Sequence, residues 1–174
     1  MPCHCENLHN GRKIAVLLSC PGRHELNAGR PAARQTGKNL EMVLNKLGLS
    51  RSEVAIDNAS SKVFFKSLNH RTEAPLNEVL DPQNINRLDQ ELFPETKIIL
   101  AMGNIPYEVA KALQKLHPDL IVVKSHHPGF CSLNHIKKDV NENDILRGDV
   151  DATQKRVDVI VEDILSQTKY FTIK

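Results

Sequence analysis

Three polar side chains of this 174-residue chain are of types that can do chemistry, and each follows an apolar run. His127 carries an imidazole, which donates or accepts hydrogen bonds and changes charge near neutral pH. Asn58 carries a carboxamide, which offers one acceptor and two donors to a polar ligand edge. Glu25 carries a carboxylate, which can polarise a water molecule. We therefore take these three residues as the leading candidates for a catalytic site.

Each candidate also has a purely structural interpretation. His127 and the histidine before it could cap a turn that precedes a proline. Asn58 could form an Asx turn at the end of a strand. Glu25, and equally Asp57, could be ordinary surface charges, which is the usual state of acidic side chains. The position of each residue relative to the strands is what favours the functional interpretation.

The chain alternates apolar runs with amphipathic segments, which predicts a parallel sheet covered by helices on both faces. Strands are expected at 13–18, 53–58, 97–102 and 120–123, and helices at 37–47, 84–93, 105–116 and 150–167. In the helix expected at 105–116, Val109, Leu113 and Leu116 should face inward. Irregular loops are expected at 19–36 and 60–82. The predicted class is α/β, a three-layer αβα sandwich around a four-stranded parallel sheet.

The polar segments of interest all follow the ends of expected strands. They are the loop after Leu18, the pair Asp57-Asn58 and the segment 125–130 (SHHPGF). In open α/β sheets, ligands bind beyond the carboxyl ends of the strands. The layout therefore gathers Glu25, Asn58 and His127 at one rim.

Composition sets the class of protein. Hydrophobic residues make up 40% and charged residues 25%, as in ordinary globular domains. We expect a flexible N-terminus at 1–12, a single domain at 13–170 and a monomer. No apolar run approaches the roughly 18 residues that a membrane helix needs, and the first residues lack a secretory apolar core, so we expect a cytoplasmic protein without membrane contact. The net charge of +2 is compatible with a local basic face.

The cysteines suggest neither a disulfide framework nor a standard metal site. There are four, Cys3, Cys5, Cys20 and Cys131, and such a count in an intracellular chain does not indicate disulfides. The tract Cys3-His4-Cys5 could bind a metal, but its spacing is short and no second ligand pair follows. The alternative is a frayed terminus with incidental side chains. We expect no bound metal and no cofactor.

The same segments resemble the uracil-DNA glycosylase superfamily, and its iron–sulfur branch, family 4, in particular. That branch carries G-E-A-P-G-x-x-E followed by G-R-P-F-V-G-x-A-G. Here residues 18–25 are LSCPGRHE and residues 29–37 are GRPAARQTG. The family next has a strand that ends in Asn, followed by a Lys, an Arg and a Pro, and here these are Asn58, Lys62, Arg71 and Pro75. Its last two landmarks are a strand that ends in Gly and a His-Pro motif, and here these are Gly103 and His127-Pro128-Gly129. The resemblance covers residues 14–136.

The chain departs from the family pattern at three places. An iron–sulfur cluster needs four thiolates, but Val63 holds the place of the third cysteine and no cysteine lies between Cys20 and Cys131. Ser19 replaces a carboxylate that, in the family, helps to orient the attacking water. Ala32 replaces the aromatic residue that floors the uracil pocket.

The resemblance implies a monofunctional DNA glycosylase, a hydrolase that flips a base out of DNA and cleaves its bond to the sugar. The transition state of such cleavage puts positive charge on the sugar and negative charge on the base. By resemblance, His127 would donate to a carbonyl oxygen of the base and Asn58 would bind the pyrimidine edge. Glu25 or Asp57 would polarise the water, which the Ser19 hydroxyl could also hold.

The resemblance and the basic loops also indicate binding residues. The base pocket is expected to comprise Cys20, Pro21, Gly22, Ala32 and Ala33. Phosphate contacts are expected at Arg30, Gly37, Lys38, Lys62, Ser125, His126 and Gly129. Among these, Gly37 would open a helix whose N-terminus attracts anions. The alternative is a solvated basic loop. Phe64 and Phe65 lie among basic residues in the sequence. They could line a nucleic-acid groove, or they could pack in the core.

The substrate hypothesis follows from Ala32. Losing an aromatic floor forfeits base stacking of about 1–3 kcal/mol and widens the pocket. We therefore hypothesise a larger flipped pyrimidine with a bulky 5-substituent, for example a sugar-modified cytosine in viral DNA, and hence a defence role. Phe64, Phe65 or Phe130 could instead restore the wall. The alternatives are uracil excision in base-excision repair, a non-catalytic DNA-binding module, and an enzyme on free nucleosides.

Overall fold

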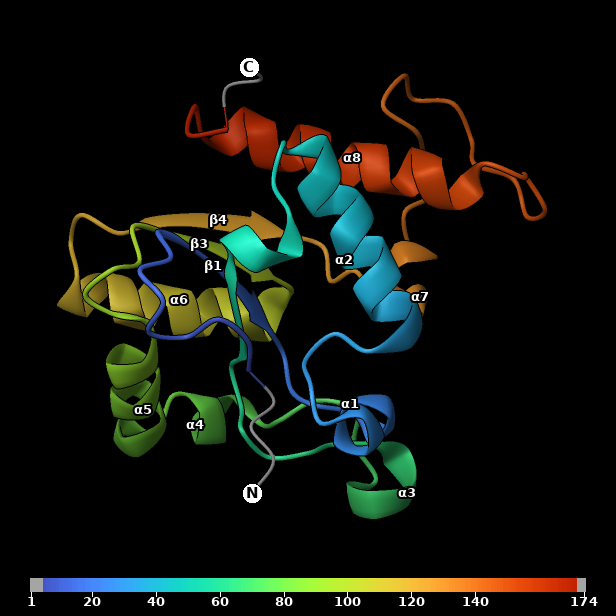
Figure 1. The fold of residues 1–174 in the computed structure, drawn as a ribbon. Helices are drawn as coiled ribbons and strands as arrows, with labels where there is room; N and C mark the ends of the chain where they lie inside the picture. Colours follow the sequence, from blue (N-terminus) through green and yellow to red (C-terminus); the bar gives the residue numbers. More distant parts are fainter. Residues whose placement is uncertain (1–4, 172–174) are drawn as a thin grey trace.

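The computed structural model describes residues 5–171 (Figure 1). In this part of the chain, four parallel strands form one sheet in the order β2-β1-β3-β4. They are β1 (Ile14–Leu18), β2 (Ala55–Asn58), β3 (Ile98–Met102) and β4 (Ile121–Ser125). β1 pairs with β2 so that Leu18 lies opposite Asn58. The parallel sheet expected from the sequence is confirmed.

The two central strands are apolar on both sides because both sides are covered. Every residue of β1 (IAVLL) and β3 (IILAM) is buried, as continuous apolar strands of a parallel sheet require. β4 is an edge strand, and its first residue, Ile121, is 39% exposed.

Helices cover the sheet on both faces (Figure 1). On one face, α2 (Arg34–Lys46) and α8 (Ala152–Gln167) pack their apolar stripes against the sheet. On the other face lie α5 (Pro82–Leu92) and α6 (Asn104–Leu116). This is the expected αβα sandwich. The expectation that Leu116 faces inward is wrong: it is 57% exposed at the last position of α6, and the buried stripe consists of Pro106, Val109, Ala110 and Leu113.

Several element boundaries differ from the sequence-based expectation. α2 begins three residues before Gly37, β2 excludes Glu53, β4 continues to Ser125, and α8 begins at Ala152. Short helices also interrupt the segments expected to be irregular. These are α1 (Arg23–Ala28), α3 (Lys66–Asn69) and α4 (Leu76–Val79). A further short helix, α7 (Phe130–Leu133), and a 3₁₀ turn at Arg51–Glu53 lie outside those segments.

The segment before β1 docks on the edge of the sheet. The Glu6 N–H donates to the Ile56 carbonyl over 2.8 Å, and the Ile56 N–H donates back over 2.9 Å. Glu6 Oε2 also pairs with Arg51 Nε at 2.6 Å. This docking differs from the expectation of a flexible terminus at 1–12, because a strand-like bridge anchors residue 6. Residues 1–4, with the tract Cys3-His4, lie outside the described residues.

Two further features concern the cysteine side chains and the length of the helices. Cys20 and Cys131 carry free thiols. Among the described helices, none combines the length and the apolar character that crossing a bilayer requires.

Candidate active site

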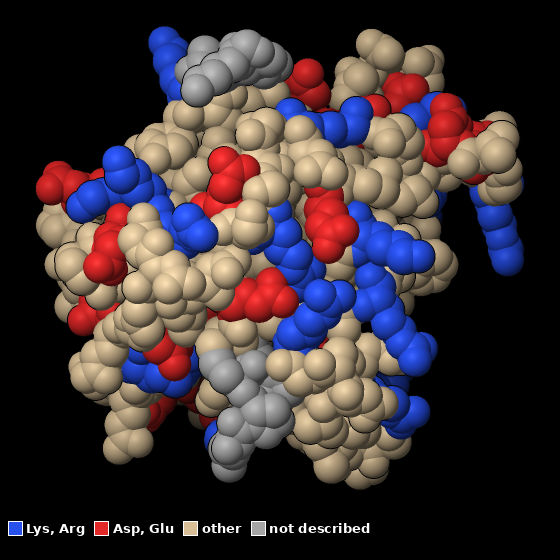
Figure 2. Space-filling model, in the orientation of Figure 1, with Lys and Arg blue, Asp and Glu red and all other residues tan. Residues whose placement is uncertain are grey.

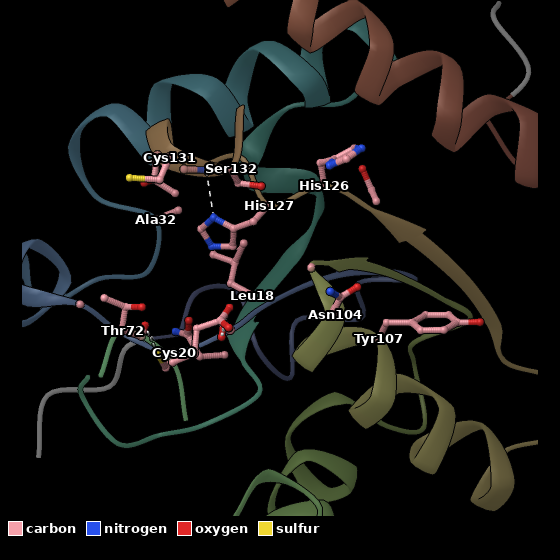
Figure 3. Close-up of a pocket in the computed structure, with 18 of the residues that line it drawn as sticks. Leu18, Cys20, Ala32, Thr72, Asn104, Tyr107, His126, His127, Cys131 and Ser132 are labelled. Carbon is pink, nitrogen blue, oxygen red and sulfur yellow. Dashed lines mark hydrogen bonds between the residues drawn. The ribbon is translucent and has the colours of Figure 1, made fainter. Parts of the chain in front are cut away.

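A cavity of about 970 Å³ opens at the carboxyl edge of the sheet. Its wall includes Leu18, Asn58 and Ser125, which end β1, β2 and β4, and Gly103, which directly follows β3. Figure 3 shows Cys20 and Thr72 on one side of it, Asn104 and Tyr107 on another, and His127 projecting from the segment that also carries Cys131 and Ser132. Asn58 and His127, which are far apart along the chain, both line this cavity, as their places at strand ends predicted.

A backbone hydrogen bond determines the protonation of His127. The Gly129 N–H donates to His127 Nδ1 over 2.9 Å (dashed in Figure 3). Because Nδ1 accepts, the proton of the neutral ring sits on Nε2. Burial lowers the pKa of His127 to about 4, and the negative charge of Glu25 opposes part of that shift. At neutral pH the imidazole is therefore an uncharged hydrogen-bond donor through Nε2.

Glycine at position 129 makes this contact possible. A Cβ at position 129 would lie 2.8 Å from His127 Nδ1 and 3.1 Å from its Cε1. Both distances are too short for a side chain, so any larger residue would displace the ring or its own backbone. Glycine at this position thus allows the amide to close on the imidazole.

Asn58 is held at the end of β2 through its backbone. Its carbonyl accepts a hydrogen bond from Arg87 Nη2 over 3.0 Å, and its N–H donates to Asp57 Oδ1 over 2.7 Å. Only 2% of the residue is exposed. These contacts fix the strand end, so that a carboxamide stands in the cavity wall.

Asp57 does not line the cavity, contrary to its proposed part in holding water. Adjacent strand residues point to opposite faces, and Asp57 turns away to Arg87, whose Nη1 lies 3.2 Å from Asp57 Oδ2. Arg87 also pairs with Glu91. Burial holds the pKa of the Asp57 carboxyl above its ordinary value, Arg87 opposes the shift and Glu91 adds to it. Asp57 belongs to a buried network that braces the strand end.

Glu25 lines the cavity, but its carboxylate ties two loops together. Oε2 accepts from the Gly22 N–H over 3.1 Å, and Oε1 accepts from the Ala33 N–H over 3.0 Å. Both carboxylate oxygens therefore accept hydrogen bonds from backbone N–H groups. Glu25 connects the loop after β1 to the start of α2 and places a negative charge near His127.

A carboxylate that the sequence analysis missed reaches the cavity from another segment. Ser19, which is 5% exposed, donates through Oγ to Glu73 Oε1 over 3.3 Å. Next to it, Cys20 Sγ donates to the Thr72 carbonyl over 3.5 Å. Burial raises the pKa of Cys20 to about 11, so the thiol is neutral. Glu73 lies in a polar stretch without periodicity, and no sequence signal marked it.

The residues expected to form a base pocket differ in whether they line the cavity. Cys20, Gly22 and Ala32 line the cavity, whereas Pro21 and Ala33 are buried residues outside its wall. Of the three phenylalanines considered as substitutes for the missing aromatic floor, Phe64 and Phe130 line the cavity. Phe65 does not, and the Arg23 guanidinium carbon lies 5.1 Å from the centre of its ring.

The expected phosphate contacts divide into two groups. Ser125, His126 and Gly129 line the cavity, whereas Arg30 and Lys38 are exposed residues outside its wall. Lys62 also lies outside it, with Nζ 2.8 Å from Glu78 Oε2. Basic side chains stand over the part of the surface that carries α1 and α2, and acidic side chains lie among them (Figure 2).

The expectation that Gly37 opens a helix and exposes its amide is wrong. Gly37 is the fourth residue of α2, because the helix begins at Arg34 with Ala33 as its N-cap. The Gly37 N–H already donates to the Ala33 carbonyl over 3.4 Å, and the residue is buried. Its amide is therefore committed to the helix.

Comparison with known proteins identifies one family. No curated protein matches the chain. The family model of the uracil DNA glycosylase superfamily matches residues 11–147, which include all four strands and the cavity-lining segments from Leu18 to Ser132. The chain therefore belongs to the uracil DNA glycosylase superfamily.

Proposed function

We propose that the protein is a monofunctional DNA glycosylase that hydrolyses the bond between a flipped, modified pyrimidine and its sugar, leaving an abasic site. Membership of the superfamily supports glycosylase activity on DNA. The observation that carries the proposal is the convergence of Asn58 and His127, from β2 and β4 at the two edges of the sheet, on one cavity.

The charge that develops on the base explains the chemistry proposed for His127. When the glycosidic bond breaks, its electron pair leaves with the base, and the sugar becomes oxocarbenium-like. A fixed donor aimed at the developing negative charge binds the transition state more tightly than the substrate. The Nε2–H of neutral His127, a residue of the cavity wall, is such a donor. The carboxamide of Asn58 complements the donors and acceptors of a pyrimidine edge.

The nucleotide must leave the duplex before its glycosidic bond can be reached. Ser125 at the end of β4, and His126 and Gly129 between β4 and α7, line the cavity, and we assign them to the phosphates that flank the flipped nucleotide. Such contacts fix the register of the protein on DNA without selecting a sequence. The exposed Arg30, Lys38 and Lys62 are proposed to bind phosphates at a greater distance.

The size of the cavity supports a large base. About 970 Å³ is near the upper end of the roughly 300–1,000 Å³ found for pockets that hold drug-sized ligands, which is far more than a bare pyrimidine fills. Ala32 brings only a methyl group to the cavity wall, where the family pattern has an aromatic side chain. We therefore favour a pyrimidine with a bulky 5-substituent, such as a sugar-modified cytosine in viral DNA, and a role in defence.

One observation favours a second candidate, excision of plain uracil in base-excision repair. Phe64, 7% exposed, enters the cavity wall from the segment after β2. Its ring could stack on a small base in place of the missing aromatic floor.

The test is to incubate the protein with duplexes that carry uracil, 5-hydroxymethylcytosine, glucosylated 5-hydroxymethylcytosine or no modified base, and to measure free base by mass spectrometry. We expect the fastest release from the glucosylated duplex and none from the unmodified one. Release of uracil at least as fast as any bulky base would contradict the bulky substrate. Binding to every duplex without release from any would contradict glycosylase activity and favour a non-catalytic module.

A further inference from the structure

Hydrolysis requires a group that holds the attacking water beside the sugar and balances the positive charge there. The loop after β1 offers only the hydroxyl of Ser19 for this purpose, and a hydroxyl alone is a poor base. The carboxylate must therefore come from another part of the cavity wall.

Three of the described residues bring a carboxylate to the cavity: Glu25, Glu73 and Asp163. Both oxygens of Glu25 accept backbone N–H groups. Asp163 belongs to α8, at the part of the wall that also includes Gln167 of the same helix. Of these three carboxylates, Glu73 is the one that accepts a hydrogen bond from the Ser19 hydroxyl in the described part of the chain.

The geometry of Glu73 suits this task. Its Oε1 accepts the Ser19 Oγ–H over 3.3 Å, and within residues 5–171 no donor is hydrogen-bonded to its Oε2. The loop around it is anchored on both sides. Thr72 accepts from the Cys20 thiol over 3.5 Å, and Ala74 is 3% exposed. A carboxylate with one oxygen fixed and the other open to the cavity can hold a water molecule in a defined place.

We propose that Glu73, oriented by Ser19, is the catalytic base that holds and deprotonates the attacking water. This assignment rests on the proposed glycosylase function. The water oxygen forms a bond to the sugar C1′ while the bond from C1′ to the base nitrogen breaks. The electron pair of the broken bond leaves with the base, which Asn58 and His127 hold. The water proton passes to the Glu73 carboxylate, which releases it to solvent, and the base anion takes a proton from solvent in turn.

This assignment explains why the loop after β1 has no acidic side chain in the position where the family pattern has one. Serine carries no negative charge, but its hydroxyl donates to a glutamate that comes from the facing loop. The negative charge beside Ser19 thus comes from a different segment of the chain.

The test compares Glu73→Gln with wild type in single-turnover base release, on whichever duplex the wild type cleaves best. General-base catalysis contributes at least about 10²-fold, so we expect the cleavage rate to fall by that factor while the Kd for DNA stays unchanged. The control is Glu95→Gln, which removes the same charge from an exposed residue shortly before β3, at the opposite end of the strands. It should cleave like wild type.

Two rescue experiments separate catalysis from support of the loop. Formate should restore part of the rate to Glu73→Ala, in which a small carboxylate can occupy the vacated space. Ser19→Glu should restore part of the rate in the Glu73→Gln background, because it supplies a carboxylate from the facing loop. A rate loss that neither change repairs, or that accompanies weaker DNA binding, would overturn the assignment.

The assignment of Glu73 and the proposed glycosylase function can be contradicted by different results. If the wild type releases base and Glu73→Gln releases it equally fast, Glu73 is not the base and the glycosylase function stands. If the wild type releases no base from any modified DNA, both proposals are overturned.

Discussion

At the residue scale, the contact between Gly129 and His127 decides what the imidazole can do. A charged histidine would hold a base anion more strongly, but burial in the cavity wall makes the charged form costly. The structure instead fixes a neutral ring and assigns its proton to Nε2. Such a ring gives a hydrogen bond that strengthens as the base becomes negative, and it needs no change of charge during the reaction.

This tautomer leads to a prediction about pH. Burial lowers the pKa of His127 to about 4 in the folded protein, whereas an unperturbed histidine has a pKa of about 6.5. Between these values the unfolded chain binds the proton and the folded one does not. Acidification from about pH 6.5 towards 4 should therefore remove stability, while the folded ring stays neutral.

The measurement is an NMR titration of the imidazole nitrogens of His127. The expected spectrum at pH 7 is that of the neutral ring protonated at Nε2, without protonation above about pH 5. Gly129→Ala, which places a methyl group against Nδ1, should shift this spectrum. A His127 midpoint close to 6.5, or a proton on Nδ1, would contradict the account.

Residue types at strand ends were enough to predict Asn58 and His127, because a parallel sheet brings the ends of its strands to one edge. The same argument could not separate Asn58 from Asp57, which are neighbours in sequence. The alternation of side chains along a strand separates them, and the ion pair with Arg87 shows which one turns away. Glu73 could not be predicted, since its role depends on a contact with Ser19 between distant loops.

At the scale of elements, the start of α2 depends on one close approach. Gly37 lies on the buried side of the first turns, where the chain from Ala32 passes directly over it. A Cβ at position 37 would stand 2.2 Å from the Ala32 carbonyl oxygen. Backbone cannot move away as a flexible side chain can, so glycine is required for packing and not for its conformational freedom.

We therefore predict that Gly37→Ala destabilises the protein, although alanine is the better helix former by up to about 1 kcal/mol. Crowding of a packed interior costs about 1–3 kcal/mol, and the contact here is with backbone. Urea denaturation should show a lower free energy of unfolding. The control is Asn45→Ala, at an exposed position of the same helix, which should change stability by no more than about 0.5 kcal/mol. An unchanged or raised stability for Gly37→Ala would contradict the packing seen here.

The long elements could be predicted because each buries an apolar stripe that is visible in the sequence. α2 and α8 are examples, with Leu40, Val43, Ile160 and Ile164 all fully buried. The short helices could not be predicted. α1 contains no buried residue, and the carboxylate of Glu25 holds it in place through the backbone of two loops. Such helices depend on polar contacts with the rest of the fold, which leave no periodic pattern.

At the scale of the whole molecule, the active site exists only when the sheet is complete. β2 and β4 are its two edges, with β1 and β3 between them. The cavity extends from β2 across the sheet to the end of β4, so the order of the strands determines where Asn58 and His127 lie. The sequence predicted four parallel strands, but their order depends on packing between segments far apart in the chain.

The measurement that tests the central claim most directly is single-turnover release of free base by wild type, Asn58→Ala and His127→Ala, with DNA affinity measured in parallel. We predict that each variant binds modified DNA like wild type and releases base at least about 10²-fold more slowly, as for loss of one donor to a developing anion. Release by either variant at the wild-type rate would contradict the account.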